Sequence, residues 1–456
     1  MQAERASQRT PLGPILWSSC LAMFAVGANS TAIMAALPSI RTALSLSPAG
    51  VEWAVNSYLV AAAAFIVLGG QAADRFGARQ ASMAGLALFG FASCLIATAG
   101  GGAVLLIGRA LQGLAAAFAV PSTLAAVNTV APPERRAVAI GAWTGFLMLG
   151  FSSGPLIGGA LTHVIGWRVI FWLDVPLMLT AIAGLASAGS GIARTHESPH
   201  RRVDWMGFVL LATLMVSLVF GLHALPHAKA EPLPVVGPFA LAGLALVLLL
   251  IVEPRAETPL VDLSFFAQRR FVMGVVIGSL SMFSIMSLLL YFNLYAQSRE
   301  GLGLTALEAG AALLPLSASL LALALSASTV AARAGLRDAM TGGMTLIAIG
   351  SAVISVGIAQ SGILAFLTIG FFVMGAGLAV PYALAPRLAL SALSPAQVGQ
   401  GSGVVNACTF LGGSAGVAGG ATAFALGGFV AVLMLIALAG LVGAALSRWI
   451  PEGERI

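Results

Sequence analysis

Long apolar runs recur along this chain from one end to the other, and they constrain its fold more than any other feature. Each run is roughly 18 to 25 residues long, enough for a helix to cross the hydrocarbon core of a bilayer. About fourteen runs can be distinguished. They cover residues 15–37, 51–72, 80–98, 102–128, 138–162, 167–188, 205–224, 235–253, 271–296, 306–332, 339–358, 361–385, 398–421 and 425–449. The sequence therefore predicts an all-α integral membrane protein.

The composition agrees with this prediction and excludes an ordinary soluble globule, because 59% of the residues are hydrophobic and only 8% are charged. Residues 1–14 are polar and the run that follows is too long for a signal sequence, so we expect no cleavable signal peptide. The three cysteines lie inside apolar runs, with an odd number and no metal-site spacing. We expect them to be buried apolar residues, and we expect no metal and no cofactor.

The net charge of +6 is a signal of topology rather than of nucleic-acid binding. If the N-terminus is cytoplasmic, only Arg41, Arg168, Lys229 and Arg299 lie outside and Arg109 lies within the membrane. The other 17 of the 22 Lys and Arg residues then lie on the cytoplasmic side. This asymmetry follows the positive-inside rule. It predicts a multi-pass protein of the cell (inner) membrane with both termini cytoplasmic.

Three sequence features occur twice at nearly one offset, which indicates an internal repeat. The pattern Arg-x-Gly-x-Arg at 75–79 returns at 333–337, Ala-Val-Pro at 119–121 returns at 379–381, and glycines four apart at 150–158 return at 412–420. The offset exceeds half of the chain, so a segment is inserted between the copies. We therefore predict an N-terminal six-helix bundle (1–190), a linker with two inserted helices (191–256) and a C-terminal six-helix bundle (257–456).

The first copy of the Arg-x-Gly-x-Arg pattern belongs to a charged turn between the second and third runs. The turn contains Gly70, Asp74, Arg75, Gly77 and Arg79. The glycines permit unusual dihedral angles, and Asp74 can pair with an arginine or face a helix N-terminus. We predict a cytoplasmic hinge that takes part in conformational gating.

The fifth run contains a strip of glycines four residues apart, with Gly150, Gly154, Pro155 and Gly158 at its centre. Such a strip lets another helix pack backbone to backbone, and Pro155 permits a bend. The strip can be a static packing face or a sliding seam between two halves that rock. The second copy at 412–420 favours the seam.

Arg109 lies several residues inside the fourth run, where a charge costs roughly 2.5–3.5 kcal/mol on insertion scales, so a functional role is the default hypothesis. The alternative is an arginine that snorkels to the interface. Other polar residues stand in apolar runs of both halves, where they bond between helices or line a central wet cavity. We assign to the substrate cavity Asn29, Thr31, Asn56, Tyr58, Gln112, Ser284, Tyr291, Asn293 and Asn406.

Together these motifs resemble the major facilitator superfamily, in particular its fourteen-span drug:proton antiporter branch. The turn at 70–80 is similar to the loop signature between spans two and three, and 109–113 to the span-four signature implicated in proton transfer. Residues 150–159 resemble the antiporter signature of span five. The resemblance implies a major facilitator fold of two six-helix bundles plus a two-helix insert. It also implies a non-enzymatic monomer that exports amphipathic small molecules, drugs or a related metabolite, by proton antiport and alternating access.

The chain departs from the pattern of that branch in its acidic residues. The family usually has aspartate where Asn29 stands and asparagine where Asp174 stands. In addition, no acidic residue occurs between Asp338 and Glu452. We therefore expect proton coupling to rest on the N-terminal half, on Arg109, Asp174 and Glu52. We also expect a neutral, zwitterionic or anionic substrate rather than a multivalent cation.

Other functions remain open as alternatives. One alternative is a dedicated metabolite facilitator or importer of the same fold. Only the resemblance of span five to the antiporter signature favours export over this alternative. A receptor or passive channel explains the spans but not the repeated glycine strip and charged hinge. A membrane zinc protease would use the His-Glu-x-x-His pattern of His196 and His200, but Pro199 disrupts the helix which that chemistry needs. His223 and His227 share a four-residue spacing, again with a proline between them.

Overall fold

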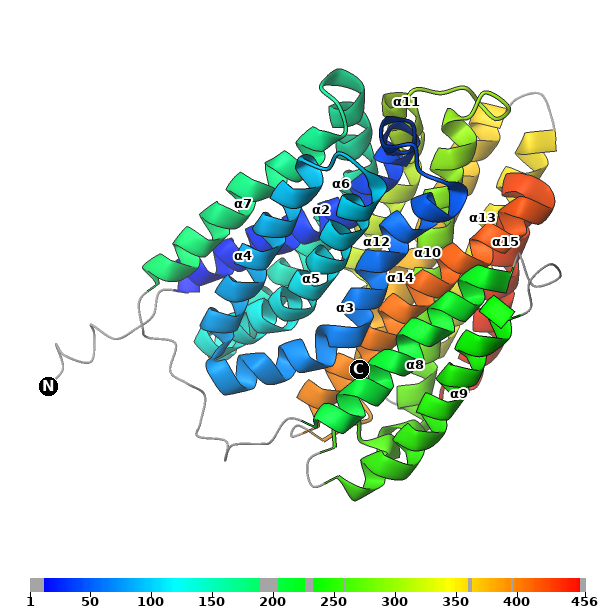
Figure 1. Ribbon diagram of the computed structural model, residues 1–456. Helices are drawn as coiled ribbons and strands as arrows, with labels where there is room; N and C mark the ends of the chain where they lie inside the picture. The colour runs from blue at the N-terminus through cyan, green and yellow to red at the C-terminus, as the bar shows by residue number, and fades with distance from the viewer. Residues whose placement is uncertain are drawn as a thin grey trace, which may run out of the picture.

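A computed structural model of the chain describes residues 12–188, 204–225, 233–256, 259–359, 363–394 and 397–451. Within these ranges the chain consists of helices and contains no strand (Figure 1). The α-helices are α2 (Leu12–Leu44), α3 (Pro48–Phe76), α4 (Ala78–Ala97), α5 (Gly102–Val130), α6 (Pro133–Val164), α7 (Arg168–Ser187), α8 (Trp205–Ala224), α9 (Leu233–Val252), α10 (Arg269–Gln297), α11 (Ala306–Ala312), α12 (Leu314–Ala334), α13 (Leu336–Ala359), α14 (Ile363–Leu390) and α15 (Val398–Ser447). Two 3-10 helices, η3 (Glu253–Arg255) and η4 (Leu263–Ala267), lie between α9 and α10.

The described residues supply fourteen membrane crossings, as the sequence predicts. Thirteen helical segments are long and apolar enough to cross a membrane, with α11 and α12 counted as one segment. The thirteenth, α15, is two helices joined at Gly427 and Gly428, whose backbone angles are not helical. Its first half starts near the α9–α10 linker, and Arg269 at the start of α10 lies 5.6 Å from the ring of Trp449 just beyond its last residue. Both ends of α15 thus lie at one end of the molecule, so α15 crosses the membrane twice. The prediction of an all-α membrane fold is confirmed.

We name the two ends of the molecule by their turns. The hinge end contains the turns at Gly77 and Gly335, and the far end contains those at Gly166 and Gly303. Gly77 has φ 91° and ψ 137°, and Gly335 has φ 85° and ψ 145°. Residues other than glycine rarely adopt a positive φ. The two copies of the Arg-x-Gly-x-Arg pattern therefore form the same turn, which supports the predicted repeat.

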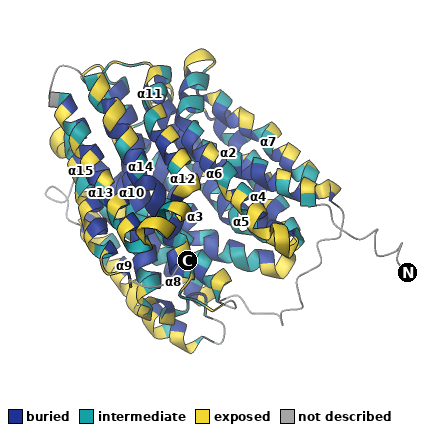
Figure 2. Ribbon diagram, turned by 180° about the vertical axis from the view of Figure 1, so that it is seen from behind, coloured by how far each residue is buried: buried dark blue, intermediate teal, exposed yellow. Residues whose placement is uncertain are grey.

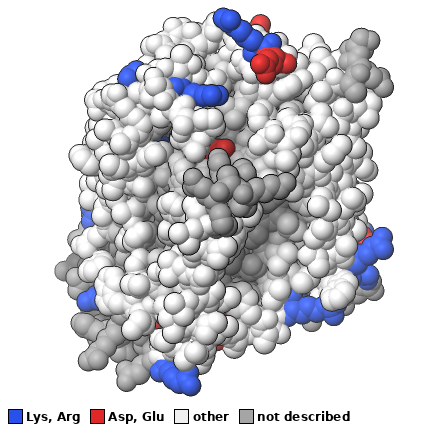
Figure 3. Space-filling model, turned by 45° about the vertical axis from the view of Figure 1, so that its right-hand side comes forward, with Lys and Arg blue, Asp and Glu red and all other residues white. Residues whose placement is uncertain are grey.

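The helices pack in two groups, α2–α7 and α10–α15, with α8 and α9 paired beside them (Figure 1). α8 contacts α3 of the first group and α15 of the second. This pattern supports the division at residues 190 and 256, which remains a prediction. The charged residues on the face drawn in Figure 3 gather mostly toward the two ends, as expected for a protein surrounded by lipid.

The repeated glycine strip packs each group internally. A Cβ atom on Gly150 would lie 2.1 Å from the carbonyl oxygen of Phe24 in α2, so only glycine fits. A Cβ on Gly416 would lie 2.4 Å from the carbonyl oxygen of Phe283 in α10. The expectation of a sliding seam between two halves is therefore wrong for the strip itself, because its glycines hold α6 to α2, and α15 to α10, within one group.

The contact between the groups at the far end uses the neighbouring face of α6. A Cβ on Gly159 would lie 2.3 Å from the carbonyl oxygen of Ala306 in α11, and one on Gly310 would lie 2.5 Å from that of Pro155. Figure 2 shows that buried residues concentrate in the middle of the assembly, where helices of both groups meet. The outer surfaces, including that of α9, carry the exposed apolar side chains that a bilayer would cover.

Candidate functional site

Five side chains in the first group form a closed ring of hydrogen bonds. Arg109 Nη1 donates to Asn29 Oδ1 and to Gln112 Oε1, both at 2.8 Å. Asn29 Nδ2 donates to Asp174 Oδ2 at 2.7 Å. Gln112 Nε2 donates to Ser93 Oγ at 2.7 Å, and Ser93 Oγ donates to Asp174 Oδ2 at 3.1 Å. The ring ties α2, α4, α5 and α7 together.

The local structure of two neighbouring helices orients Arg109 within the ring. Gln112 lies three residues later on α5, so the two side chains share a helix face. Arg109 Nε donates to the backbone oxygen of Ala54 in α3 at 3.0 Å, and the guanidinium lies 4.6 Å from the ring centroid of Tyr58. A planar cation with five donors suits such a site, because it bonds in several directions and stacks on an aromatic face.

The ring is buried, and it contains one basic and one acidic side chain. Arg109 is fully buried and Asp174 is 4% exposed. The two charges do not touch, because the amide of Asn29 lies between them and bonds to both. A buried charge without a compensating partner is strongly unfavourable, so each charge depends on the ring. Snorkelling of Arg109 to the surface, the alternative considered above, is excluded by its complete burial.

Two atoms of the ring make no hydrogen bond within the described chain. Both hydrogen bonds to Asp174 reach Oδ2, and within the described chain no donor reaches Oδ1. Arg109 Nη2 is buried without a hydrogen-bond partner among the described residues. The carboxyl of Asp174 can therefore take up a proton at Oδ1 without direct competition from the two donors at Oδ2. A change in its charge would act directly on the bonds to α2 and α4.

The ring lies closer to the far end than to the hinge end. Asp174 follows the first residue of α7 by six positions, which corresponds to about 9 Å of helix rise. Arg168, at that first residue, donates to the carbonyl oxygen of Ala99 at 2.9 Å and closes the neighbouring turn. A proton that arrives from the far end has the shorter distance to Asp174.

The two departures from the family pattern meet in this ring. Asn29 and Asp174 exchange the residue types expected at their positions, and the structure places them in direct contact at 2.7 Å. With aspartate at 29 and asparagine at 174, as the resemblance implies for the family, the same contact would also join one carboxyl group and one amide.

Ser93 is the member of the ring that the sequence did not reveal. It is a single serine in the apolar helix α4, and such serines commonly bond to their own helix backbone, as Ser82 does to Ala78 in the same helix. Ser93 differs from these serines only because α4 packs against α5 and α7, which brings its hydroxyl to Gln112 and Asp174. Its position opposite Gln112 closes the ring.

The other residues predicted for the substrate cavity in the first group lie outside the ring. Thr31 Oγ1 donates to the backbone oxygen of Phe151 at 2.9 Å and serves the packing of α2 on α6. Asn56 Oδ1 accepts from Ser414 Oγ at 2.9 Å, a direct bond between the two groups, while its Nδ2 is buried without a partner among described residues. Tyr58 bonds with Ser30 and faces Phe410 of the second group.

The predicted cavity residues of the second group bond mainly to the backbone. Ser284 donates to Leu280 at 2.9 Å, and the side chains of Asn293 and Asn406 each donate to the carbonyl four residues earlier. Tyr291 donates to the backbone oxygen of Val417 at 2.7 Å and joins α10 to α15. The structure does not bring these residues into a network comparable with the ring.

Glu52 does not take part in the ring. Its Oε2 lies 2.9 Å from Nε2 of His223, near the end of α8, and Trp53 beside it packs on the same histidine. The grouping of Glu52 with Arg109 and Asp174 is therefore corrected. Glu52 faces the inserted helices because it lies on a different side of α3 from Ala54 and Tyr58.

The predicted hinge residues lie together at the hinge end. Arg79 donates to the carbonyl oxygens of Leu185 and Ala186, both at 2.7 Å, and so caps the end of α7. Arg75 lies 5.5 Å from the ring of Phe76, and Gly70 has open space beside it. Asp74 is exposed at the same turn. The hinge thus connects α3, α4 and α7, the last of which carries Asp174.

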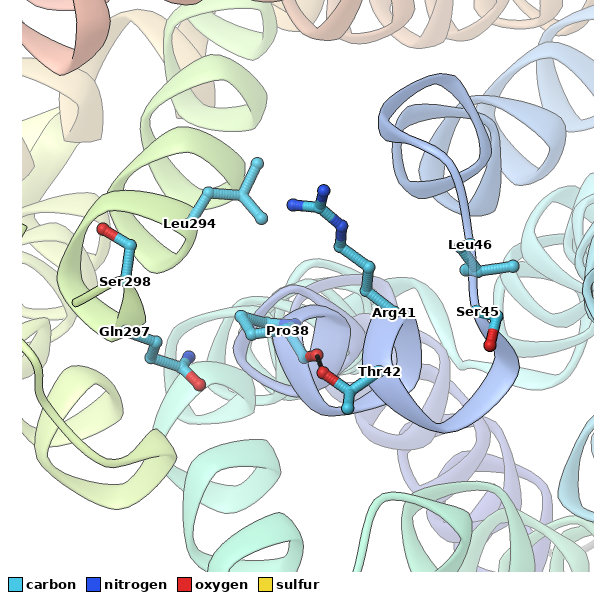
Figure 4. A pocket seen from close by; sticks show the side chains of 8 residues that line it. All are labelled: Pro38, Arg41, Thr42, Ser45, Leu46, Leu294, Gln297 and Ser298. Atoms are coloured by element: carbon cyan, nitrogen blue, oxygen red, sulfur yellow. Dashed lines mark hydrogen bonds between the residues drawn. The ribbon is translucent and has the colours of Figure 1, made fainter. Parts of the chain in front are cut away.

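The far end is closed between the two groups. Gln297 Nε2, at the end of α10, donates to the backbone oxygen of Ala35 in α2 at 2.9 Å. Next to this contact, and also lined by Gln297, lies a cavity of about 430 Å³. Its lining residues are Pro38, Arg41, Thr42, Ser45, Leu46, Leu294, Gln297 and Ser298. Figure 4 shows the side chain of Arg41 extending across it toward Leu294. The remaining contacts of α6 with α11 lie at this same end.

The metal-site alternatives gain no support from the described chain. His196 and His200 lie outside the described residues, as does His227. Among the described residues no group of three or more potential ligands comes together. Cys20, Cys94 and Cys408 are free; Cys20 is buried, as the sequence predicts, whereas Cys94 and Cys408 are only partly buried.

Comparison with known proteins places the chain in a family of transporters. The model of the Major Facilitator Superfamily matches residues 19–355. The chain is 33% identical over 407 residues to the tetracenomycin C resistance and export protein of Streptomyces glaucescens, a match to 89% of this chain and 74% of that protein. It is 33% identical over 287 residues to the methylenomycin A resistance protein of Bacillus subtilis, covering 63% and 60%. It is 26% identical over 402 residues to the multidrug resistance protein Stp of Mycobacterium tuberculosis, covering 87% and 73%. With the fold and the internal repeat, these matches show that the chain belongs to the Major Facilitator Superfamily.

Proposed function

We propose that this chain exports amphipathic small molecules, drugs or a related metabolite, in exchange for protons, and that Asp174 carries the proton. The observation on which the proposal rests is the buried ring, in which one acid and one arginine share an amide between them. An ionisable residue inside a membrane protein is by default a functional group. The names of the relatives, which describe resistance and export, support the direction of transport.

The orientation of the chain follows from its charge distribution. We propose that the hinge end and both termini face the cytoplasm of a cell (inner) membrane, in accordance with the positive-inside rule. The closed far end then faces outward, so the described conformation is one in which the outer side is sealed. The shorter path to Asp174 from the far end suits a proton that enters from outside.

The exchange can be derived from the ring. With Asp174 ionised, its Oδ2 accepts from Asn29 and Ser93, which holds α7 against α2 and α4. Protonation at Oδ1 removes the negative charge and weakens both bonds, because a neutral carboxyl is a poorer acceptor. Arg109 then loses the charge that compensates it. Since Arg79 at the hinge end also holds α7, a change at Asp174 can reach the hinge turn along this single helix.

The substrate would bind between the groups rather than in the ring. Side chains from the two groups meet at Tyr58 with Phe410 and at Phe151 with Tyr382. These aromatic faces suit an amphipathic molecule. Since the second group supplies no acidic side chain there among described residues, we propose a neutral, zwitterionic or anionic substrate. We further propose that the protein functions as a monomer, without catalytic activity.

The experiment uses everted membrane vesicles that contain the full chain. They are energised, and a panel of lipophilic cations, neutral drugs and anions is tested for collapse of the pH gradient. We expect particular neutral or anionic compounds to collapse it, and Asp174→Asn and Arg109→Gln to abolish the response. Glu52→Gln is the matched control, since it removes a carboxylate of the same helix group that lies outside the ring; it should retain exchange.

The same panel separates export from the alternatives. If no compound of the panel collapses the pH gradient, and a compound is taken up independently of that gradient, a facilitator or importer of the same fold would be favoured. Exchange that survives in Asp174→Asn but is lost in Glu52→Gln would move the proton site to the pair with His223. A dication that is exchanged normally would contradict the proposed substrate class.

A further inference from the structure

The base of the inserted hairpin contains two carboxyl groups that the transport mechanism does not use. Asp204 stands immediately before α8, and Glu253 immediately follows α9. Glu253 is only 1% exposed. Its Oε2 atom and the Oδ2 atom of Asp204 are both buried, and among the described residues neither has a hydrogen-bond partner other than the opposing carboxyl group.

The backbone fixes how the two carboxyls face each other. Asp204 Oδ1 accepts from the backbone N–H of Gly207 at 2.8 Å, and Glu253 Oε1 accepts from that of Val261. The remaining oxygens converge on Gly207, where an added Cβ would lie 2.5 Å from Glu253 Oε2 and 2.6 Å from Asp204 Oδ2. They lie within hydrogen-bonding reach of each other.

Two ionised carboxylates cannot bond to each other, because each is only an acceptor. Like charges in a shared buried site favour one retained proton, which turns one oxygen into a donor. We propose that Asp204 and Glu253 form a proton-binding site at the hinge end and hold one proton between them. The proton satisfies the two oxygens that otherwise lack a partner.

The charged groups on the described neighbouring elements do not neutralise this pair. Within the described chain, Asp204 is the charged side chain that acts on Glu253. The other charged side chains nearby have different partners. Arg255 donates to the backbone oxygen of Ile251, and Arg269 lies over the ring of Trp449. Asp262 accepts from the backbone N–H of Ser264, and Arg270, at the start of α10, is also engaged in an interaction. On α15 the side chains that face the linker are the amides Gln397 and Gln400.

The site braces the linker that leads into the second group. Glu253 holds the N–H of Val261, and Gln400 Nε2 donates to the carbonyl oxygens of Pro259 and Leu260 at 2.8 and 2.9 Å. Leu260 and Val261 are buried in an apolar cluster with residues of α3, α8, α9 and α15. Loss of the proton would place two negative charges beside this linker and weaken its attachment. The site therefore makes the docking of the linker depend on pH at the end that we propose is cytoplasmic.

The sign of the pH effect follows from the bound proton. The folded protein holds a proton that separated carboxyls of an unfolded chain would release more readily, so the stabilisation is present at acidic pH and is lost as pH rises. Asp262 behaves in the opposite way. Its hydrogen bonds with Ser264 hold its pKa below the ordinary value, so it stays ionised throughout such a titration.

The test measures thermal stability and amide exchange of the purified full chain between about pH 5 and pH 9. The wild-type protein should lose stability as pH rises, and the amide of Val261 should exchange more than tenfold faster relative to its intrinsic rate. Glu253→Gln should remove both dependences and keep the acidic-pH values, because its amide donates permanently to Asp204. Asp204→Asn is the second variant, with the same expectation. Asp262→Asn is the matched control and should keep the wild-type pH dependence.

Two results would overturn the proposal. One is a Glu253→Gln protein whose stability and Val261 exchange follow pH as in the wild type. The other is a wild-type loss at high pH that sodium, but not choline, reverses, since that result assigns the site to a metal cation. Neither measurement involves transport, so the outcome is independent of the proposed export function.

Discussion

The two groups of helices share a packing framework but differ in their polar chemistry. In both, a glycine strip lets a later helix lie on the first one, and the turns at Gly77 and Gly335 have nearly the same backbone angles. Within the part of the chain that the structure describes, only the first group contains a buried ring of charged and amide side chains. The contact of α10 with α15 in the second group repeats that of α2 with α6 in the first. Both use side-chain bonds to the backbone, from Ser287 and Tyr291 to α15 and from Thr31 to α6. The repeat thus preserves how the helices pack, while among the described residues the buried arginine and acid pair occurs in one copy.

The largest expected effect comes from breaking the ring at its cation. Arg109→Met leaves Asp174 buried without a compensating charge, and such a change costs about 3–5 kcal/mol. The matched change in the second group, Ser287→Ala, removes one hydrogen bond worth about 1 kcal/mol. Thermal unfolding of both variants in the same detergent measures the difference. Equal losses would contradict the asymmetry.

A smaller effect should be shared by the two groups, because it concerns the packing they have in common. Gly154→Ala and Gly416→Ala each place a Cβ within 2.4 Å of a neighbouring oxygen. Overpacking of this kind costs about 1–3 kcal/mol. Gly70→Ala has nothing within 4 Å and serves as control. Tolerance of the change at Gly416 but not at Gly154 would argue against a repeated framework.

The paired turns offer a third comparison of similar design. Gly77→Ala and Gly335→Ala force a side chain into positive φ, at a cost of about 1–2 kcal/mol. We expect similar losses of stability from both. Only Gly77→Ala should also slow proton-coupled exchange, because its turn adjoins Arg79 and thereby α7. Slowed exchange in both variants would mean that the second hinge carries the coupling equally.

The smallest expected effect distinguishes a serine in the ring from a serine on its own helix. Ser93→Ala removes a bond to Asp174 and one from Gln112, for a loss of about 1 kcal/mol and a shifted pH profile of exchange. Ser284→Ala removes only a bond to Leu280, four residues earlier. Its pH profile should match the wild type. A shift in Ser284→Ala as large as in Ser93→Ala would show that the profile reports general disturbance.

The sequence predicts the fold well because bilayer thickness sets helix length directly. Each apolar run corresponds to a membrane crossing, although the reversal inside α15 falls at Gly427 and Gly428, just inside the last predicted run (425–449) rather than before it. The repeat could be found because close backbone contact and positive φ both require glycine. Whether the strip packs helices within one group or between the two groups could not be predicted, since a glycine face does not identify its partner helix.

The site was predictable as single residues and not as a network. Arg109, Asp174 and Asn29 stand out because a charge in an apolar run, or a departure from a family pattern, is visible in one dimension. Ser93 has no such signal. Glu52 carries the same signal as Asp174, but it faces α8, and the side of a helix that a neighbour covers depends on the tertiary packing.

The most direct test of the account exchanges the two side chains at the Asn29–Asp174 contact. Proton-coupled exchange is measured in everted vesicles for Asp174→Asn and for the double variant Asn29→Asp with Asp174→Asn. The account predicts loss in the single variant and recovery in the double variant, because the carboxyl group then lies on the other side of one 2.7 Å hydrogen bond. Undiminished exchange in the single variant, or no recovery in a folded double variant, would contradict it.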